Sequence, residues 1–476
     1  MDNDSTKKNA KNLTNEKSNK YNVEERIKLL FDENSFVEIG SYIREKNTRV
    51  ITGYGTVSGK LVYAYAFDYE LNGGVFTKKA SEKICNIMDM AAKMGAPIVK
   101  MYDSIGSDLS ENLDILLAYG KLIDKSSKFS GVIPQISIVY SACSGLLAVG
   151  SAISDFNIVI NESSQVYLND PKDVIVHESK YIDSKSYGNA LNLMDNGTAQ
   201  ILCDNEKQAI SLARKLVSYL PSNNLEFPID DNIDEDSNKK NLQNICQIEN
   251  LSEEICDTGT LININNIWNT QVDTNLGKIG GIVVGIIESR EGAKLTIRDV
   301  NKIGRFVKVC DCFNIPIVSL VDCKGFLESI DEEKQGFIME LAKTFTTITQ
   351  ATVPKLAIIV GKAFGGAYTL LSGKESTFDL VCAWPESEIC IMEPKKLLSI
   401  FYRDEILESD IPKRKENDIF DEKTKELTDI YRAAEKGYVD NIIEPPSTKD
   451  IIINSLSMMQ SKREINYPKK HGSVLI

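Results

Sequence analysis

Two short runs of small residues could together stabilise a negatively charged oxygen. Ser144-Gly145-Leu146 and Gly365-Gly366-Ala367 each follow an apolar run typical of a buried strand and precede a segment expected to be helical. The first backbone N–H groups of a helix have no partner inside it, so they point outward and can bind an anion. Glycine lets a ligand approach the backbone closely, and two such N–H groups form an oxyanion hole.

The two turns lie at equivalent positions of a duplicated sequence. The matching stretches are 97–106 with 316–325, and 131–147 with 351–367. The copies are thus about 220 residues apart, which indicates paired domains and not a solenoid of short repeats. A single glycine pair more often marks only a tight turn. Its recurrence at equivalent points favours two oxyanion sites, suited to a reaction in which two carbonyl compounds each become an anion.

Each copy is predicted to alternate helices with buried strands. Thr77 and Thr296 are candidate N-caps, and Gly95 and Asn314 are candidate stops of the same two helices. The apolar positions at helical spacing are Ile84, Ile87, Met88 and Ala91 in the first copy and Val300, Ile303, Val307 and Cys310 in the second. The predicted strands are Ile98-Val99 and Gln135 to Val139, then 317–321 and Lys355 to Val360. This alternation predicts layered α/β domains.

Length and polarity predict where the domains begin and end. A chain of 476 residues exceeds what one hydrophobic core usually supports. Residues 1–20 are nearly all polar and are predicted to be a disordered tail. Residues 230–250 include an acidic run and a pair of lysines, as expected of a linker. The predicted domains are therefore 21–229 and 251–476.

Composition argues against several classes of protein. The formal net charge is -13 and there is no basic stripe, so a nucleic-acid binder is not expected. The ten cysteines are scattered without a Cys-x-x-Cys pair, and the polar start does not resemble a signal peptide, so we expect a cytoplasmic protein. No apolar run is long enough to insert into a membrane. Cys310 and Cys312 lack further ligands nearby, so no metal site is expected.

Several motifs together resemble the carboxyltransferase subunits of biotin-dependent acyl-CoA carboxylases and decarboxylases. They are Gly131-Val132-Ile133-Pro134-Gln135-Ile136-Ser137, Ser218-Tyr219-Leu220-Pro221-Ser222-Asn223-Asn224, Gly365-Gly366-Ala367-Tyr368, Ala383-Trp384-Pro385 and Gly437-Tyr438-Val439-Asp440. The family includes propionyl-CoA carboxylase beta chains and methylmalonyl-CoA decarboxylase alpha chains. The resemblance covers nearly the whole chain after residue 20 and is more specific for the family than for the substrate.

The resemblance implies two tandem crotonase-like (ClpP/crotonase) domains, with the acyl-CoA side at 21–229 and the biotin side at 251–476. A carboxylate would move, in either direction, between biotin and a short-chain acyl-CoA such as propionyl/methylmalonyl-CoA or acetyl/malonyl-CoA. The implied oxyanion donors are Gly366 and Ala367 for biotin, and Gly145 and Leu146 for the thioester. The implied biotin-binding residues are Gly365, Gly366, Ala367 and Thr369, and the implied acyl-CoA-binding residues are Gly73, Gly74, Gly106, Ser144 and Gly145.

The resemblance also implies partners. Biotin would sit on a separate biotin carboxyl carrier protein, because Lys93 is predicted to lie in a helix and not in the hairpin of a biotin-acceptor site. A biotin carboxylase or a membrane decarboxylase subunit would complete the complex. Family members form a dimer or a trimer of dimers with the active site between subunits, so a homodimer or homohexamer is expected.

The first copy departs from the family pattern in three places. The usual Gly-Gly-Ala turn reads Gly145-Leu146-Leu147, the usual Gly-Gly-Ser-x-Gly loop reads 73–77 with Ala80 in place of a histidine, and the usual arginine segment reads 105–108. These changes motivate an alternative function, a catalytically weakened paralogue that acts as a structural or regulatory subunit. Asp103 and Asp322 stay open between catalytic carboxylates and side chains that only bind neighbouring N–H groups.

Overall fold

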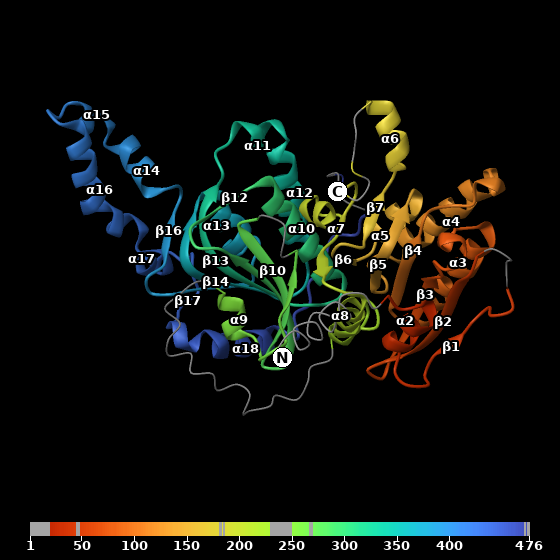
Figure 1. Ribbon diagram of the computed structural model, residues 1–476. Coiled ribbons are helices and arrows are strands. Elements are labelled where there is room, and N and C mark those ends of the chain that lie inside the picture. The colour runs from red at the N-terminus through yellow and green to blue at the C-terminus, as the bar shows by residue number, and fades with distance from the viewer. Residues whose placement is uncertain are drawn as a thin grey trace, which may run out of the picture. The chain divides into compact units, whose positions relative to one another are not determined.

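The computed structural model describes residues 20–43, 48–179, 183, 186–228, 250–265, 270–470 and 473 (Figure 1). The predicted tail and linker lie almost wholly outside these described residues. The chain divides into two compact units, Met1–Phe227 with Asn265–Trp268, and Pro228–Ile264 with Asn269–Ile476. Within the described ranges, no helix combines the length and the apolar character that crossing a membrane requires.

The first unit is a mostly parallel sheet with helices packed on it (Figure 1). Its strands are β1 Val37–Glu38, β2 Val50–Val57, β3 Lys60–Phe67, β4 Ile98–Ser104, β5 Gln135–Ser144, β6 Phe156–Ile160, β7 Gln165–Tyr167 and β8 Ile201–Cys203. Its helices are α2 Val23–Leu30, α3 Lys78–Met94, α4 Leu113–Phe129, α5 Leu146–Ala152, α6 Pro171–Glu178, α7 Ala190–Asp195 and α8 Glu206–Tyr219. The strand order is β1-β2-β3-β4-β5-β6-β8, with β7 beside β5. Helix α3 packs on β2, β3 and α4, whereas α8 packs on α2, β5 and β6.

The second unit has the same plan (Figure 1). Its strands are β9 Ile262–Ile264, β10 Val272–Ile279, β11 Ile282–Ser289, β12 Ala293–Leu295, β13 Ile317–Phe326, β14 Lys355–Phe364, β15 Leu380–Ala383, β16 Glu388–Cys390 and β17 Asn441–Ile442. Its helices are α9 Leu251–Ile255, α10 Ile297–Cys312, α11 Ile330–Lys334, α12 Phe337–Gln350, α13 Gly365–Ser372, α14 Pro394–Phe401, α15 Arg403–Leu407, α16 Pro412–Thr428, α17 Ile430–Glu435 and α18 Thr448–Met459. The strand order is β17-β15-β14-β13-β11-β10-β9, with β12 beside β13 and β16 beside β14.

The two sheets repeat each other in register. The β4–β5 ladder begins where Ile98 faces Gln135, and the β13–β14 ladder begins where Ile317 faces Lys355. Both ladders then shift register at the same point, after Tyr102 in the first unit and after Val321 in the second. The tandem duplication and the α/β class predicted from the sequence are therefore confirmed.

A pair of aspartates shows the same repetition in the antiparallel part of each sheet. Asp32 accepts hydrogen bonds from the N–H groups of the β2–β3 turn and forms an ion pair with Arg214 on α8, at 2.8 Å. Asp257 accepts hydrogen bonds from the N–H groups of the β10–β11 turn and forms an ion pair with Lys449 on α18, at 2.9 Å. Each carboxylate thus ties a hairpin turn to the last long helix of its unit.

The predicted helix ends are confirmed, but the strands run further than predicted. Thr77 and Thr296 cap α3 and α10 through their side chains, and Gly95 and Asn314 adopt positive φ angles just after the helices. Strands β5 and β14 continue beyond the predicted ends at Val139 and Val360, because β7 and β16 pair with their last three residues. The two small-residue turns therefore lie at the extended carboxyl edge of each sheet.

Candidate active site

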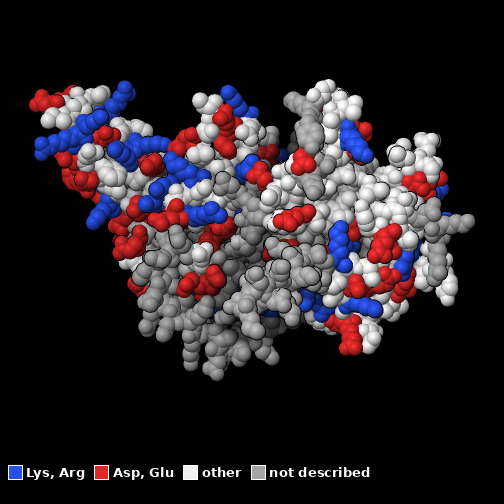
Figure 2. Space-filling model, in the orientation of Figure 1, with Lys and Arg blue, Asp and Glu red and all other residues white. Residues whose placement is uncertain are grey.

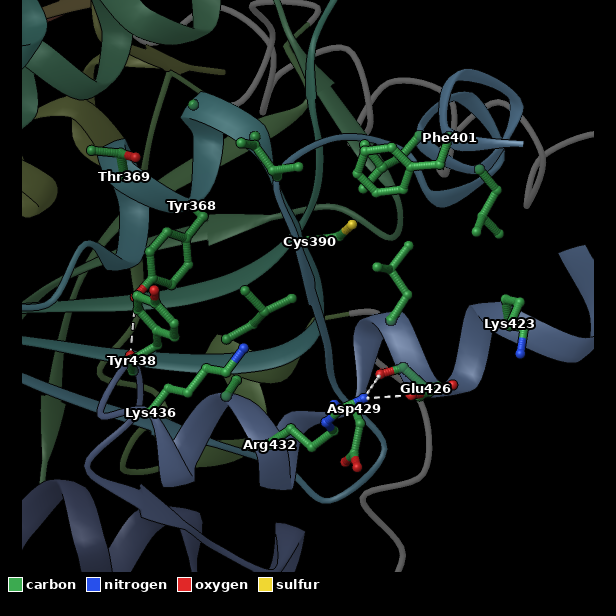
Figure 3. Close-up of a pocket in the computed structure, with 18 of the residues that line it drawn as sticks. Tyr368, Thr369, Cys390, Phe401, Lys423, Glu426, Asp429, Arg432, Lys436 and Tyr438 are labelled. Atoms are coloured by element: carbon green, nitrogen blue, oxygen red, sulfur yellow. Dashed lines mark hydrogen bonds and ion pairs between the residues drawn. The ribbon is translucent and has the colours of Figure 1, made fainter. Parts of the chain in front are cut away.

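The second turn opens into a cavity of about 740 Å³ (Figure 3). Strand β14 ends at Phe364, the N-cap of α13, and Gly365 follows with a φ of 60° that favours glycine. Gly365, Gly366 and Thr369 line the cavity, and the side chain of Ala367 is completely buried beside them. The structure thus brings together the residues that the sequence proposed for this turn.

Gly366 must be small because of an aromatic ring opposite it. A Cβ atom at this position would lie 2.5 Å from Cε2 of Phe326, and that ring packs edge-on against Phe337 at 5.6 Å. The ladder registers make Ser107 and Leu146 the first-unit counterparts of Phe326 and Gly366. The first unit therefore has the small residue Ser107 where the second has Phe326, and the large residue Leu146 where the second has Gly366.

This exchange predicts a compensating pair of substitutions. Gly366→Ala should lower the free energy of unfolding by about 1–3 kcal/mol, because the added methyl overlaps the rigid ring. Adding Phe326→Ser, which copies Ser107, should remove most of that penalty, so the double variant should be more stable than the sum of the single effects. Urea denaturation of the four proteins measures the coupling. Strictly additive effects would show that the ring does not limit the size of residue 366.

The cavity has apolar walls and a charged rim (Figure 3). Its apolar lining includes Ile389, Leu397, Leu398, Phe401 and Leu427. On the rim, Arg432 donates to Glu426 at 3.1 Å, and Asp429 accepts from the N–H of Tyr431 at 2.9 Å. Both lining carboxylates are thus engaged in local contacts. The cavity can hold a partly apolar ligand against the N–H groups of the turn.

Two tyrosines line the cavity beside α13. The Tyr368 hydroxyl donates to the carbonyl of Tyr438 at 3.0 Å, and burial raises the pKa of Tyr368, so the hydroxyl stays protonated near neutral pH.

On the outer surface over α14 to α16, acidic and basic side chains are interspersed (Figure 2), as in the Lys415–Glu405 pair at 2.6 Å. Exposed pairs of this kind contribute little to stability.

Three loops meet at the first turn. The carbonyl of Gly73 accepts from the N–H of Ile105 at 3.0 Å, and that of Gly106 accepts from the N–H of Phe76 at 2.8 Å. The Ser144 hydroxyl donates to the carbonyl of Ile105 at 2.6 Å. These bonds bring together the residues that the sequence proposed for acyl-CoA binding, which are Gly73, Gly74, Gly106, Ser144 and Gly145. Two of these bonds join main-chain groups, and the third depends on the Ser144 side chain.

One of the two backbone donors predicted for the first turn already has a partner. The N–H of Gly145 already donates to the carbonyl of Tyr167 at 3.0 Å, which extends the β5–β7 ladder by one bond. The register makes Leu146 and Leu147 the counterparts of Gly366 and Ala367. They are the first residues of α5, where N–H groups lack an intrahelical partner. Gly145 shapes the turn with a φ of 63°, and the available backbone donor of the predicted pair is Leu146.

Tyr119 on α4 lies beside the first turn, which the sequence did not predict. Its hydroxyl oxygen lies 3.6 Å from the point where a Cβ atom of Gly145 would be, and the Ser107 side chain lies near it. The helical pattern of α4 gives no hint of this, because a mostly buried aromatic residue on such a helix is typical of the core.

The two strand-end aspartates have structural partners. Asp103 is buried, pairs with Arg26 at 2.6 Å and accepts a hydrogen bond from the Ser141 hydroxyl. Asp322 accepts from the N–H of Lys362 at 2.9 Å. Of the two alternatives left open by the sequence, these contacts favour side chains that bind neighbouring groups. Across the described part of the chain, no cluster of three or more potential metal ligands occurs.

Comparison with known proteins gives one consistent family. A model described as the carboxyl transferase domain matches residues 14–474. The chain is 32% identical to methylmalonyl-CoA decarboxylase subunit alpha of Propionigenium modestum, over 96% of this chain and 93% of that one. It is 31% identical to a putative propionyl-CoA carboxylase beta chain of Bacillus subtilis (strain 168), over 96% and 94%. A solved transcarboxylase 12S, with methylmalonyl-coenzyme A and methylmalonic acid bound, superposes with a TM-score of 0.90 at 30% identity, over 96% and 92%.

Proposed function

The chain belongs to the carboxyl transferase domain family, and from that membership we propose that it moves a carboxylate between carrier-bound biotin and a short-chain acyl-CoA. It is a biotin-dependent acyl-CoA carboxyltransferase by family. The acyl pair would be propionyl/methylmalonyl-CoA or acetyl/malonyl-CoA, since relatives are named for methylmalonyl-CoA, propionyl-CoA and acetyl-CoA. The single observation that most supports two-substrate transfer is the repeated turn at the carboxyl edge of both sheets.

The biotin side is assigned to the second unit. The N–H groups of Gly366 and Ala367 would bind the ureido oxygen, while Gly365 and Thr369 would contact the ring system in the cavity. The cavity of about 740 Å³ lies in the size range of small-molecule sites, and Gly365 and Gly366 line it without side chains of their own. Bound biotin would supply or accept the carboxyl group. The turn itself would stabilise negative charge on an oxygen held against it.

The acyl-CoA side is assigned to the first unit. The N–H of Leu146 would bind the thioester oxygen and stabilise the charge that develops there when the α-carbon loses a proton or a carboxylate. Gly73, Gly74, Gly106 and Ser144 would form the surrounding wall, and Gly145 would set the turn. Because no free carboxylate or histidine is found among the described groups of this turn, positioning and charge stabilisation are the expected contributions of the protein.

The proposed partners follow from the same assignment. We place biotin on a separate carrier protein, with a biotin carboxylase or a membrane decarboxylase subunit in the same complex. A homodimer or homohexamer is proposed, and the similar transcarboxylase 12S assembles as a hexamer. A cytoplasmic location is proposed, since no disulfide joins the cysteines of the described ranges.

The test is biotin-dependent decarboxylation of malonyl-CoA and methylmalonyl-CoA by the purified chain, with the product thioester followed by mass spectrometry. Turnover that requires biotin would support the proposal and would identify the acyl group. No turnover, with binding to the carrier protein intact, would favour the alternative of a catalytically weakened subunit.

A further inference from the structure

We propose that the Tyr119 hydroxyl donates a hydrogen bond to the thioester oxygen of the acyl-CoA and acts as a side-chain donor of the first oxyanion site. The inference rests on the proposed function, because it assumes that a thioester occupies the first turn. It adds a catalytic side chain to a site whose other donors are backbone N–H groups at the start of α5.

The first turn loses one of its predicted backbone donors. Oxyanion stabilisation requires donors that are already aimed at the oxygen before the reaction. The N–H of Gly145 is used by the carbonyl of Tyr167, at 3.0 Å. The remaining backbone donors belong to Leu146 and Leu147, the counterparts of Gly366 and Ala367. A hydroxyl held beside the turn would add a donor from another element.

Tyr119 is held in place to fill that role. Its ring stacks on Phe76 with the centroids 4.9 Å apart and 29° between the planes, and the residue is only 6% exposed. Its hydroxyl oxygen lies 3.6 Å from the point where a Cβ atom of Gly145 would be. Because Gly145 has no side chain, the residue at the turn does not cover the hydroxyl. A rigid aromatic ring thus presents one polar atom to the turn.

Ser107 completes the arrangement. Its side chain lies near the Tyr119 hydroxyl, and it occupies the position that Phe326 holds in the second unit. A small polar residue there leaves room for the half-buried Leu146 side chain beside the tyrosine hydroxyl. Burial raises the pKa of Tyr119, so the group keeps its proton and remains a donor near neutral pH.

The principal test is Tyr119→Phe, which keeps the stacked ring and removes only the hydroxyl. Biotin-dependent turnover of malonyl-CoA or methylmalonyl-CoA should fall by about 10²-fold, as for loss of one oxyanion donor. The matched control is Tyr65→Phe, because the Tyr65 hydroxyl contacts that of Tyr102 at 2.7 Å inside the same core, away from the turn. The control should keep turnover close to that of the wild type.

A binding measurement separates the hydroxyl from general damage to the fold. Calorimetry should show that Tyr119→Phe binds propionyl-CoA about tenfold more weakly, whereas S-propyl-CoA, a thioether without the carbonyl oxygen, binds unchanged. Equal effects on both ligands, or turnover equal to the wild type, would overturn the inference. A wild-type chain that binds both ligands but shows no turnover would contradict the proposed function instead. The difference between thioester and thioether would then decide the role of Tyr119.

Discussion

Ala367→Pro is expected to lower biotin-dependent carboxyl transfer by about 10²- to 10³-fold, the usual cost of losing one oxyanion donor. Proline removes the N–H that is proposed to bind the ureido oxygen. Ala367 is the third residue of α13, inside the first turn, where the missing N–H interrupts no intrahelical bond. The loss should therefore be catalytic, with the secondary structure of the chain largely preserved. Initial rates of malonyl-CoA or methylmalonyl-CoA decarboxylation with free biotin provide the measurement.

The matched control for this substitution is Ala367→Gly. Glycine keeps the N–H and removes one buried methyl group, at a stability cost of about 1 kcal/mol. Its turnover should stay within a few-fold of the wild type. If the folded proline variant turned over as fast as the glycine variant, Ala367 would have no role as a donor.

Lys100→Met is expected to raise the free energy of unfolding of the first unit by up to about 5 kcal/mol near pH 6. This upper value is the free-energy equivalent of the lowered pKa of Lys100. Lys100 is completely buried on β4, and its Nζ atom has no hydrogen-bond partner among the described residues. Burial lowers its pKa from 10.5 to about 7, opposed by the charge of Asp155. Methionine fills a similar volume without a polar atom, so nothing buried loses a partner.

The effect should depend on pH in a defined direction. Between pH 7 and 10.5 the unfolded chain holds a proton on this lysine that the folded chain lacks, so wild-type stability rises with pH across this window. The difference in the free energy of unfolding between the methionine variant and the wild type should therefore be largest below pH 7 and should shrink as the pH approaches 10.5. Urea denaturation of both proteins at pH 6, 8 and 10 measures the difference.

Lys302→Met is the matched control, because Lys302 is equally buried but has partners. Its Nζ atom donates to the hydroxyl of Thr270 at 3.1 Å and to the carbonyl of Val272 at 2.8 Å. Removing the ammonium group takes one donor from each acceptor, although the Thr270 hydroxyl still donates to the carbonyl of Val272 at 2.9 Å. Burial also lowers the pKa of Lys302, to about 8, so this variant should be less stabilised than Lys100→Met at pH 6 and should lose about 1 kcal/mol at pH 10. If Lys100→Met were also destabilising at every pH, the Lys100 ammonium group would have to be satisfied in the folded chain.

Much of the fold could be predicted because it depends on local patterns. The caps at Thr77 and Thr296 and the apolar stripes of α3 and α10 were predicted correctly, since side-chain spacing decides which face of a helix is buried. The predicted carboxyl ends of the two buried strands were wrong. Strands β5 and β14 extend to Ser144 and Phe364 because β7 and β16 pair with them, and such pairing joins segments that are distant along the chain.

The candidate site shows the same division. The sequence by itself determined the duplication, the two small-residue turns and the motifs of the family, because each is a property of residue order. Only the tertiary structure decided that the Gly145 N–H donates to the carbonyl of Tyr167 and that Tyr119 reaches the first turn. It also decided that the ring of Phe326 lies against Gly366, whereas the first unit has Ser107 and Leu146 at these positions. These features depend on contacts between separate elements, and such contacts are set by packing and strand register, which spacing along the chain does not specify.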